Sequence, residues 1–173
     1  MAVAVSLSGL PQMHPLLLWE PIIPAAFLVF QQRGMEPPYR FVMAIEDLPG
    51  FGTDMLELAI ETPGISPLMI ERCERTFELS RLIEFAAIAI AGLTLHAAGG
   101  HELIDVARRG SAADYLVDAA RHPLEIAGRS RRRDLNSAWE QKEPRLRARS
   151  SRACYLCLCE FESLTGRLAF RQS

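Results

Sequence analysis

Two acids in the second half of the chain have the setting of a metal-binding pair. Asp114 opens the segment Asp-Tyr-Leu-Val, Glu125 is the second residue of Leu-Glu-Ile-Ala, and ten residues lie between the two acids. Each acid is at the edge of a segment with the composition of a β-strand, so neighbouring strands can bring the two carboxylates together. Mg²⁺ prefers oxygen ligands, and a bound metal can act on a phosphodiester. The pattern therefore predicts that Asp114 and Glu125 bind Mg²⁺.

Each acid also has a simpler interpretation. Asp114 follows the turn Gly110-Ser111, where aspartate is favoured because its side chain hydrogen-bonds to the backbone. Glu125 lies between apolar residues on an expected inner strand, where an acid is seldom buried without a partner. An ion pair with Arg129, or with one of the arginines at 131–133, would supply that partner. The positions of the two carboxylates decide between these interpretations.

The charge of the chain is unevenly distributed. The net charge of −2 divides into 7 basic against 15 acidic residues in 1–120, a balance of −8, and 12 against 6 in 121–173, a balance of +6. Arg129, Arg131, Arg132 and Arg133 begin the basic part, and arginine makes forked contacts with phosphate, so DNA or RNA is the expected partner. The alternative is a solvated surface whose charges balance within the fold. The run has no interleaved aromatic residues, so the sequence does not indicate stacking of single strands.

The apolar patterning predicts an α/β (α+β) fold with a central mixed sheet. Residues 80–97 have apolar side chains at helical spacing and end at Gly99-Gly100, which stops a helix. Pro144 should make a later helix kink or restart, because an interior proline removes a backbone hydrogen bond. The other expected elements are an N-terminal β-hairpin at 39–46 and 55–61, a short helix within 67–78, strands at 102–108, 114–118 and 124–128, a helix at 135–147, and strands at 154–161 and 166–171.

The order of elements in residues 80–161 is helix, three strands, helix, strand. This αβββαβ order, together with the two acids, resembles the PD-(D/E)xK superfamily, the restriction endonuclease-like nucleases. The resemblance implies that Asp114 is the first motif acid, Glu125 the second, and Glu84 an additional metal-binding carboxylate on the first helix. It also implies Mg²⁺ as the cofactor.

The chain departs from that pattern at Ala127, where the family has a lysine two residues after the second acid. That lysine would stabilise the charge that develops on the phosphate. In some members the group has moved to the following helix, where Gln141 and Lys142 are the candidates. The resemblance implies either a metal-dependent phosphodiesterase acting on DNA or RNA, or a nuclease-like fold that has lost its chemistry and binds nucleic acid or protein.

Residues 1–34 show no coherent period and contain four prolines at intervals, so an irregular extension that contributes little to the core is expected before a single domain at 35–173. A second possibility is that the native chain begins near Met35. The apolar stretch Pro15–Phe30 is broken by Glu20, Pro21 and Pro24, so no membrane segment is expected and a cytoplasmic location is the default.

The four cysteines have no spacing that indicates a zinc site. Cys154, Cys157 and Cys159 fall in a continuous apolar run, where a free thiol behaves as a small apolar side chain. On a strand, Cys157 and Cys159 would share one face and Cys154 would point to the other. Buried thiols without zinc are therefore expected.

Overall fold

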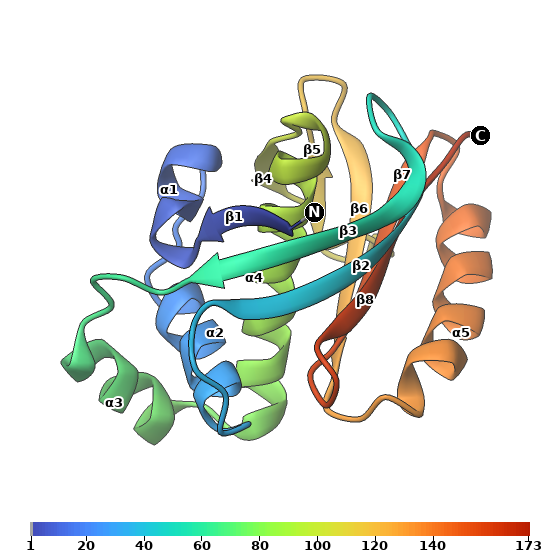
Figure 1. Ribbon diagram of the computed structural model, residues 1–173. Coiled ribbons are helices and arrows are strands. Elements are labelled where there is room, and N and C mark those ends of the chain that lie inside the picture. Colours follow the sequence, from blue (N-terminus) through green and yellow to red (C-terminus); the bar gives the residue numbers. More distant parts are fainter. Residues whose placement is uncertain (1) are drawn as a thin grey trace.

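The computed structural model describes residues 2–173 as one eight-stranded mixed sheet with helices on both faces (Figure 1). The order of strands across the sheet is β1-β3-β2-β8-β7-β6-β5-β4. The strands are β1 (Ala2–Ser6), β2 (Tyr39–Leu48), β3 (Gly52–Glu61), β4 (Leu103–Val106), β5 (Tyr115–Val117), β6 (His122–Arg129), β7 (Cys154–Glu160) and β8 (Thr165–Arg171). The helices are η1 (Leu7–Gly9), α1 (Leu10–Met13), α2 (Ile22–Gln31), α3 (Pro67–Thr76), α4 (Leu79–Gly99) and α5 (Asp134–Arg149).

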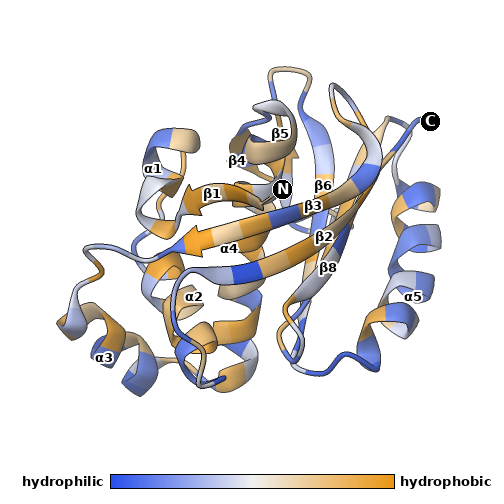
Figure 2. Cartoon of the chain, in the orientation of Figure 1, coloured by the Kyte–Doolittle hydropathy of each residue, from blue (hydrophilic) through white to orange (hydrophobic). Residues whose placement is uncertain are grey.

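Helices α4 and α2 cover one face of the sheet and α5 covers the other. Figure 2 shows hydrophobic residues concentrated along α2 and α4, whereas α5 is largely hydrophilic. Strand β7 is buried along its whole length because it is covered on both faces. Its residues alternate between the two cores, with Cys157 and Cys159 on the α4 side and Cys154 on the α5 side, as expected.

Helix α4 is long and apolar enough by composition to cross a membrane, and 67% of its most apolar 18-residue window is buried within the protein. It packs against α2 and against strand β6. Gly128 of β6 lies so close to the backbone and side chain of Ile83 in α4 that a β-carbon at this position would clash. The apolar character of α4 is therefore explained by its place between α2 and the sheet.

The α/β class with a central mixed sheet is confirmed. In chain order the second half runs α4, β4, β5, β6, α5, β7, which is the expected αβββαβ order. Strand β5 is antiparallel to both β4 and β6, β6 is parallel to β7, and β7 is antiparallel to β8. The N-terminal hairpin of β2 and β3 is also present. The sequence pattern was sufficient here because each element has a clear period and a clear stop signal.

The last helix does not stop and restart at Pro144. Helix α5 continues through Pro144 to Arg149. The proline ring lies on the exposed side of the helix, while Trp139 and Leu146, on either side of it in sequence, are buried against the sheet. Packing of the two flanking turns therefore keeps the helix continuous despite the missing backbone donor.

The expectation of an irregular N-terminal extension is also wrong for residues 2–34. Strand β1 pairs in parallel with β3 at the edge of the sheet, and α2 packs along α4. Trp19 and Phe30 are among the buried side chains of the main core. The sequence shows no helical period in α2 because most sides of this helix are buried, so it has no polar face to alternate with the apolar one.

A buried histidine joins the N-terminal segment to the rest of the fold. The His14 Nδ1 atom accepts a hydrogen bond of 3.0 Å from the N–H of Leu103, and Nε2 donates one of 3.0 Å to the carbonyl of Gly92. Both ring nitrogens are thus occupied by backbone groups of β4 and α4. Burial lowers the pKa of His14, which favours the neutral ring that this arrangement requires. Residues before Met35 are therefore part of the domain.

Candidate active site

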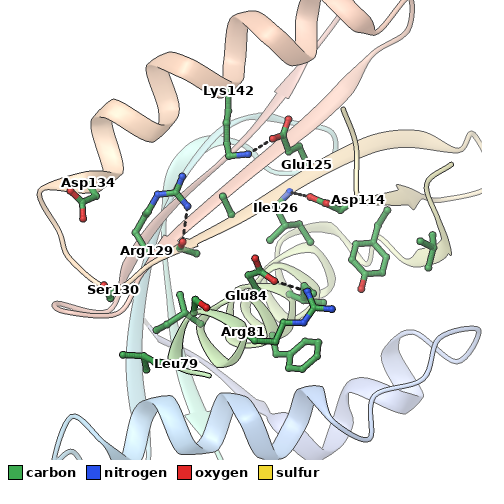
Figure 3. Close-up of a pocket in the computed structure, with 18 residues that line it drawn as sticks. Leu79, Arg81, Glu84, Asp114, Glu125, Ile126, Arg129, Ser130, Asp134 and Lys142 are labelled. Atoms are coloured by element: carbon green, nitrogen blue, oxygen red, sulfur yellow. Dashed lines mark hydrogen bonds and ion pairs between the residues drawn. The ribbon is translucent and has the colours of Figure 1, made fainter. Parts of the chain in front are cut away.

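A cavity of about 820 Å³ lies between the first turns of α4, one edge of β6 and the inner side of α5. Asp114, Glu125, Lys142 and Glu84 all line it (Figure 3). Its volume falls within the range of pockets that bind small molecules. The fold therefore places the two predicted acids, the additional carboxylate Glu84 and the candidate Lys142 around one cavity.

The cavity begins where strand β5 ends. Strand β6 pairs with β7 as far as Arg129 but pairs with β5 only through residues 122–124. Asp114 extends this pairing, because its N–H donates to the carbonyl of Leu124 at 2.8 Å and its Oδ2 accepts from the N–H of Ile126 at 2.7 Å. Beyond Ile126 this edge of β6 has no neighbouring strand and forms a wall of the cavity.

Glu125 is buried and only partly satisfied. Leu124 and Ile126 pack on the α4 side of the sheet, so Glu125 points to the α5 side. Its Oε1 atom forms an ion pair with the Lys142 ammonium, but its Oε2 atom is buried and has no hydrogen-bond partner among residues 2–173. Only 4% of Glu125 is exposed. A buried polar atom without a partner is costly and calls for an explanation, and a bound cation would provide one.

Lys142 extends from α5 to Glu125 and is the only lysine in the chain, whereas the other 18 of the 19 basic residues are arginines. Lysine provides a compact point charge where arginine provides a wide planar fork. This count was available from the sequence and would have separated Lys142 from its neighbour Gln141. Gln141 is exposed and does not line the cavity.

Ala127, where the family pattern has lysine, is buried beneath α5. It packs in the apolar cluster that contains Ala138 and Trp139. Trp139 is a core residue, 4% exposed, whose Nε1–H donates to Glu143 at 3.0 Å. Ala127 also lines the cavity, where its methyl group supplies no charge, whereas Lys142 reaches Glu125 from helix α5.

The electrostatic environment of Asp114 favours its neutral form. Burial raises the pKa of Asp114 above its usual value, and the negative charges of Glu125 and Glu84 act in the same direction. The N–H of Ile126 and the ammonium of Lys142 oppose this effect without cancelling it. A bound divalent cation would relieve the repulsion between two neighbouring acids.

Glu84 faces the cavity from α4 but is engaged elsewhere. Its Oε2 accepts from Arg81 Nη1 at 2.7 Å, and its side chain is 55% exposed. This exposed ion pair between residues one helical turn apart is a sufficient structural role for Glu84. Figure 3 shows the Arg81–Glu84 pair on the opposite side of the cavity from Lys142 and Glu125.

The predicted nucleic-acid-binding arginines lie at and beyond the rim. Arg129 lines the cavity, donates to the carbonyl of Gly128 at 2.8 Å, and has no carboxylate within ion-pair distance in the described chain. Arg131, Arg132 and Arg133 are exposed between Ser130 and Asp134, two residues that line the cavity. None of these arginines pairs with Glu125, so that interpretation of the acid is wrong.

The donor set can be compared with the needs of different metals. Residues 2–173 contain no group of three or more His, Cys, Asp or Glu side chains arranged to hold a metal ion. Of the four carboxylates that line the cavity, Glu84 and Asp134 pair with arginines, which leaves Asp114 and Glu125 with its unpartnered Oε2. Mg²⁺ is commonly held by one or two carboxylates, with water and substrate phosphate completing its octahedron. The residues present therefore fit Mg²⁺ or Mn²⁺.

Comparison with known proteins identifies no relative. No family model matches the chain, and neither a curated protein nor a solved structure matches it significantly. Any functional conclusion must therefore come from the site itself.

Proposed function

We propose that this protein is a metal-dependent phosphodiesterase that cleaves DNA or RNA, with a site of the PD-(D/E)xK type in which the lysine has moved to the helix after the second acid. The observation that carries the proposal is the contact between Lys142 and Glu125 in the cavity that Asp114 also lines. An acid pair and a lysine are the groups that this chemistry requires, and they come from three separate segments of the chain.

Asp114 and Glu125 would hold the Mg²⁺ ion, Glu125 through its unpartnered Oε2. A bound divalent cation stabilises negative charge on a phosphate and lowers the pKa of water. Asp114 is kept in place by the N–H of Ile126, so its carboxylate is already oriented toward the cavity. Glu84 would join the ion or orient water once it is released from Arg81.

Lys142 is positioned to act on the phosphate. Its ammonium is held by Glu125, and an ammonium has three donors, so it can contact Glu125 and a phosphate oxygen at the same time. A cation aimed at an oxygen that gains charge in the transition state accelerates the reaction. Arg129 and the exposed arginines 131–133 would bind the flanking phosphates.

One observation favours a second candidate function, a nuclease-like fold that binds nucleic acid without cleaving it. The ion pair with Lys142 already neutralises one of the two acids, and the described residues provide no third carboxylate free of an ion pair in the cavity. In that case the basic rim would still bind nucleic acid.

Cleavage of labelled DNA and RNA oligonucleotides in Mg²⁺ and Mn²⁺ tests the proposal. Asp114→Asn and Glu125→Gln should each abolish cleavage, because each removes a metal ligand, and should leave nucleic-acid binding intact. Glu71→Gln is the matched control, because Glu71 is an exposed acid on α3 outside the cavity, and it should cleave as wild type does. Wild-type protein that binds both nucleic acids and cleaves neither would overturn the proposal in favour of the second candidate.

A further inference from the structure

Exposed apolar side chains gather around the candidate site. Residues 2–173 contain seven exposed large apolar side chains, and four of them border this cavity or the hollow next to it. Leu79 lines the cavity, Val106 lines both spaces, and Leu16 and Leu18 line the neighbouring hollow, which has a volume of about 360 Å³. Single exposed apolar residues are ordinary, but a group of them beside a polar site marks a binding surface.

The two spaces are neighbours that share lining residues. Tyr115 and Val106 line both, so the apolar surface runs from the first turns of α4 to the loop between α1 and α2. Phe85 lies in the cavity wall, with the Arg81 guanidinium 5.0 Å above its ring. The fold thus supplies two aromatic rings that the basic segment itself lacks. Aromatic and guanidinium planes are the surfaces on which unpaired bases stack.

Glu125 and Lys142 lie deep in the cavity, whereas Asp114 is exposed at its edge. Glu125 is 4% exposed, and the Lys142 side chain is 23% exposed. A phosphate can therefore reach Lys142 only if its strand enters the cavity. Paired bases tie a strand to its complement, and extracting a nucleotide from a duplex requires unstacking and unpairing. A strand that is already unpaired avoids this cost.

We propose that the substrate is single-stranded nucleic acid, bound with its bases against the apolar strip formed by Leu79, Phe85, Val106, Tyr115 and Leu18 and with one phosphate at Lys142. The inference rests on the proposed function, because it assigns the substrate of the same site. Arg129, the cavity-lining arginine without an acidic partner, binds a phosphate adjacent to the one that is cleaved.

Binding without metal tests this inference separately from cleavage. Fluorescence anisotropy in EDTA would compare 15-nucleotide oligothymidylate and oligouridylate with a 15-base-pair DNA duplex. The single strands should bind at least about tenfold more tightly than the duplex. Leu18→Ser and Tyr115→Leu should each weaken single-strand binding about fivefold or more, because each removes a surface for a base. Leu18 is 86% exposed, so its replacement leaves the fold intact.

Leu68→Ser is the matched control, because Leu68 is 54% exposed on α3, away from both spaces. It should bind as wild type does. Equal or tighter binding of the duplex, or equal affinities for Leu18→Ser and Leu68→Ser, would overturn the inference. Mg²⁺-dependent cleavage that does not distinguish single from double strands would overturn it and leave the proposed function standing. Preferential single-strand binding with no cleavage would instead overturn the proposed function and leave a single-strand-binding surface.

Discussion

The protein contains two clusters of acids and cations that differ in how completely they are satisfied. In the first, which we term the Arg171 network, Glu46 accepts from Arg167 through Oε1 and from Arg171 through Oε2, and Glu143 accepts from Arg171 at 2.7 Å and from Trp139 at 3.0 Å. Every carboxylate oxygen of this network has a donor. In the second, the cavity acids Asp114 and Glu125, one oxygen of Glu125 has none.

The pKa of Asp114 shifts in the opposite direction from the pKa values of Glu46 and Glu143. Burial alone would raise the pKa of Glu46, but the hydrogen bonds and charges of Arg167 and Arg171 outweigh it and hold that pKa below its usual value. Glu143 behaves in the same way beside Arg171. The pKa of Asp114 is raised. The Arg171 network therefore stabilises the fold, whereas the cavity acids are arranged at a cost to stability, as functional groups often are.

The substitution with the largest expected effect removes the positive charge of Lys142 from the cavity. Lys142→Met should lower Mg²⁺-dependent cleavage about 10²- to 10³-fold, because it removes the donor that stabilises charge on the phosphate. Metal binding should change much less, since both acids remain. Arg147→Met removes an exposed positive charge from the same helix and should retain nearly full activity. Equal rates for Lys142→Met and wild type would remove Lys142 from the mechanism.

The next effect concerns the Arg171 network. Arg171→Met should reduce the free energy of unfolding by about 2 kcal/mol, because Glu46 and Glu143 each lose a donor in a partly buried position. Urea denaturation measures this loss. Arg40→Met breaks an exposed pair with Glu57 and should cost no more than about 1 kcal/mol. A loss for Arg171→Met no greater than that for Arg40→Met would show that the network is not a stabilising element.

A smaller effect of opposite sign is expected at the cavity. Asp114→Asn keeps an oxygen to accept from the N–H of Ile126 but removes a charge that burial and neighbouring acids disfavour. At pH 7 the variant should be as stable as wild type or slightly more stable, because solvent screens much of the charge of the exposed Asp114 side chain. Thermal and urea unfolding would show this gain, and a loss of 2 kcal/mol or more would contradict the interpretation of Asp114.

The pH dependence of stability should distinguish the clusters. Because the pKa of Asp114 is raised in the folded state, its contribution is present at pH values below its ordinary pKa of about 3.9 and is lost as pH rises through the folded value. Glu46 behaves oppositely: its pKa is lowered, so its contribution is present above its ordinary pKa and is lost as pH falls through the folded value. Relative to wild type, Asp114→Asn should gain stability and Glu46→Gln should lose stability at neutral pH. Both differences in the free energy of unfolding should disappear as the pH is lowered.

The smallest expected effect is a change in Mn²⁺ affinity that tests whether Glu84 contacts the metal. Arg81→Gln breaks the ion pair that holds Glu84 away from the cavity acids and should tighten Mn²⁺ binding about two- to fivefold, the range set by the modest strength of exposed pairs. Arg75→Gln breaks the comparable Arg75–Glu71 pair on α3 and should leave Mn²⁺ affinity unchanged. Weaker binding by Arg81→Gln would show that Glu84 does not approach the metal.

Much of the site was predictable because the acids lie beside short strands with clear turns. Asp114 and Glu125 meet in one cavity because β5 and β6 are consecutive antiparallel strands. The partner of Glu125 was not predicted, because the candidates for it were Arg129 and the arginines at 131–133, and Lys142 was expected only as a replacement for the motif lysine. Of the two candidates to replace the motif lysine, helical spacing favours Lys142 over Gln141. Lys142 follows the buried Ala138 and Trp139 by four and three residues, so it lies on the same side of the helix.

The N-terminal segment could not be predicted from patterning. Helix α2 and the residues around Trp19 are apolar in nearly every direction, and a period appears only when one face is polar. The hydrogen bonds of His14 to Gly92 and Leu103 connect residues far apart in the chain, so no local pattern indicates them. The apolar strip beside the cavity has the same origin, because Leu18 reaches Val106 and Tyr115 only through this packing.

The central claim is that the cavity acids form a divalent-metal site, and calorimetric titration of the full chain with Mn²⁺ tests it most directly. The account predicts saturable binding of one ion per chain by wild type, with binding lost in both Asp114→Asn and Glu125→Gln and retained in the Glu71→Gln control. Absence of saturable binding by wild type, or equal binding by wild type and the two cavity variants, would contradict the claim.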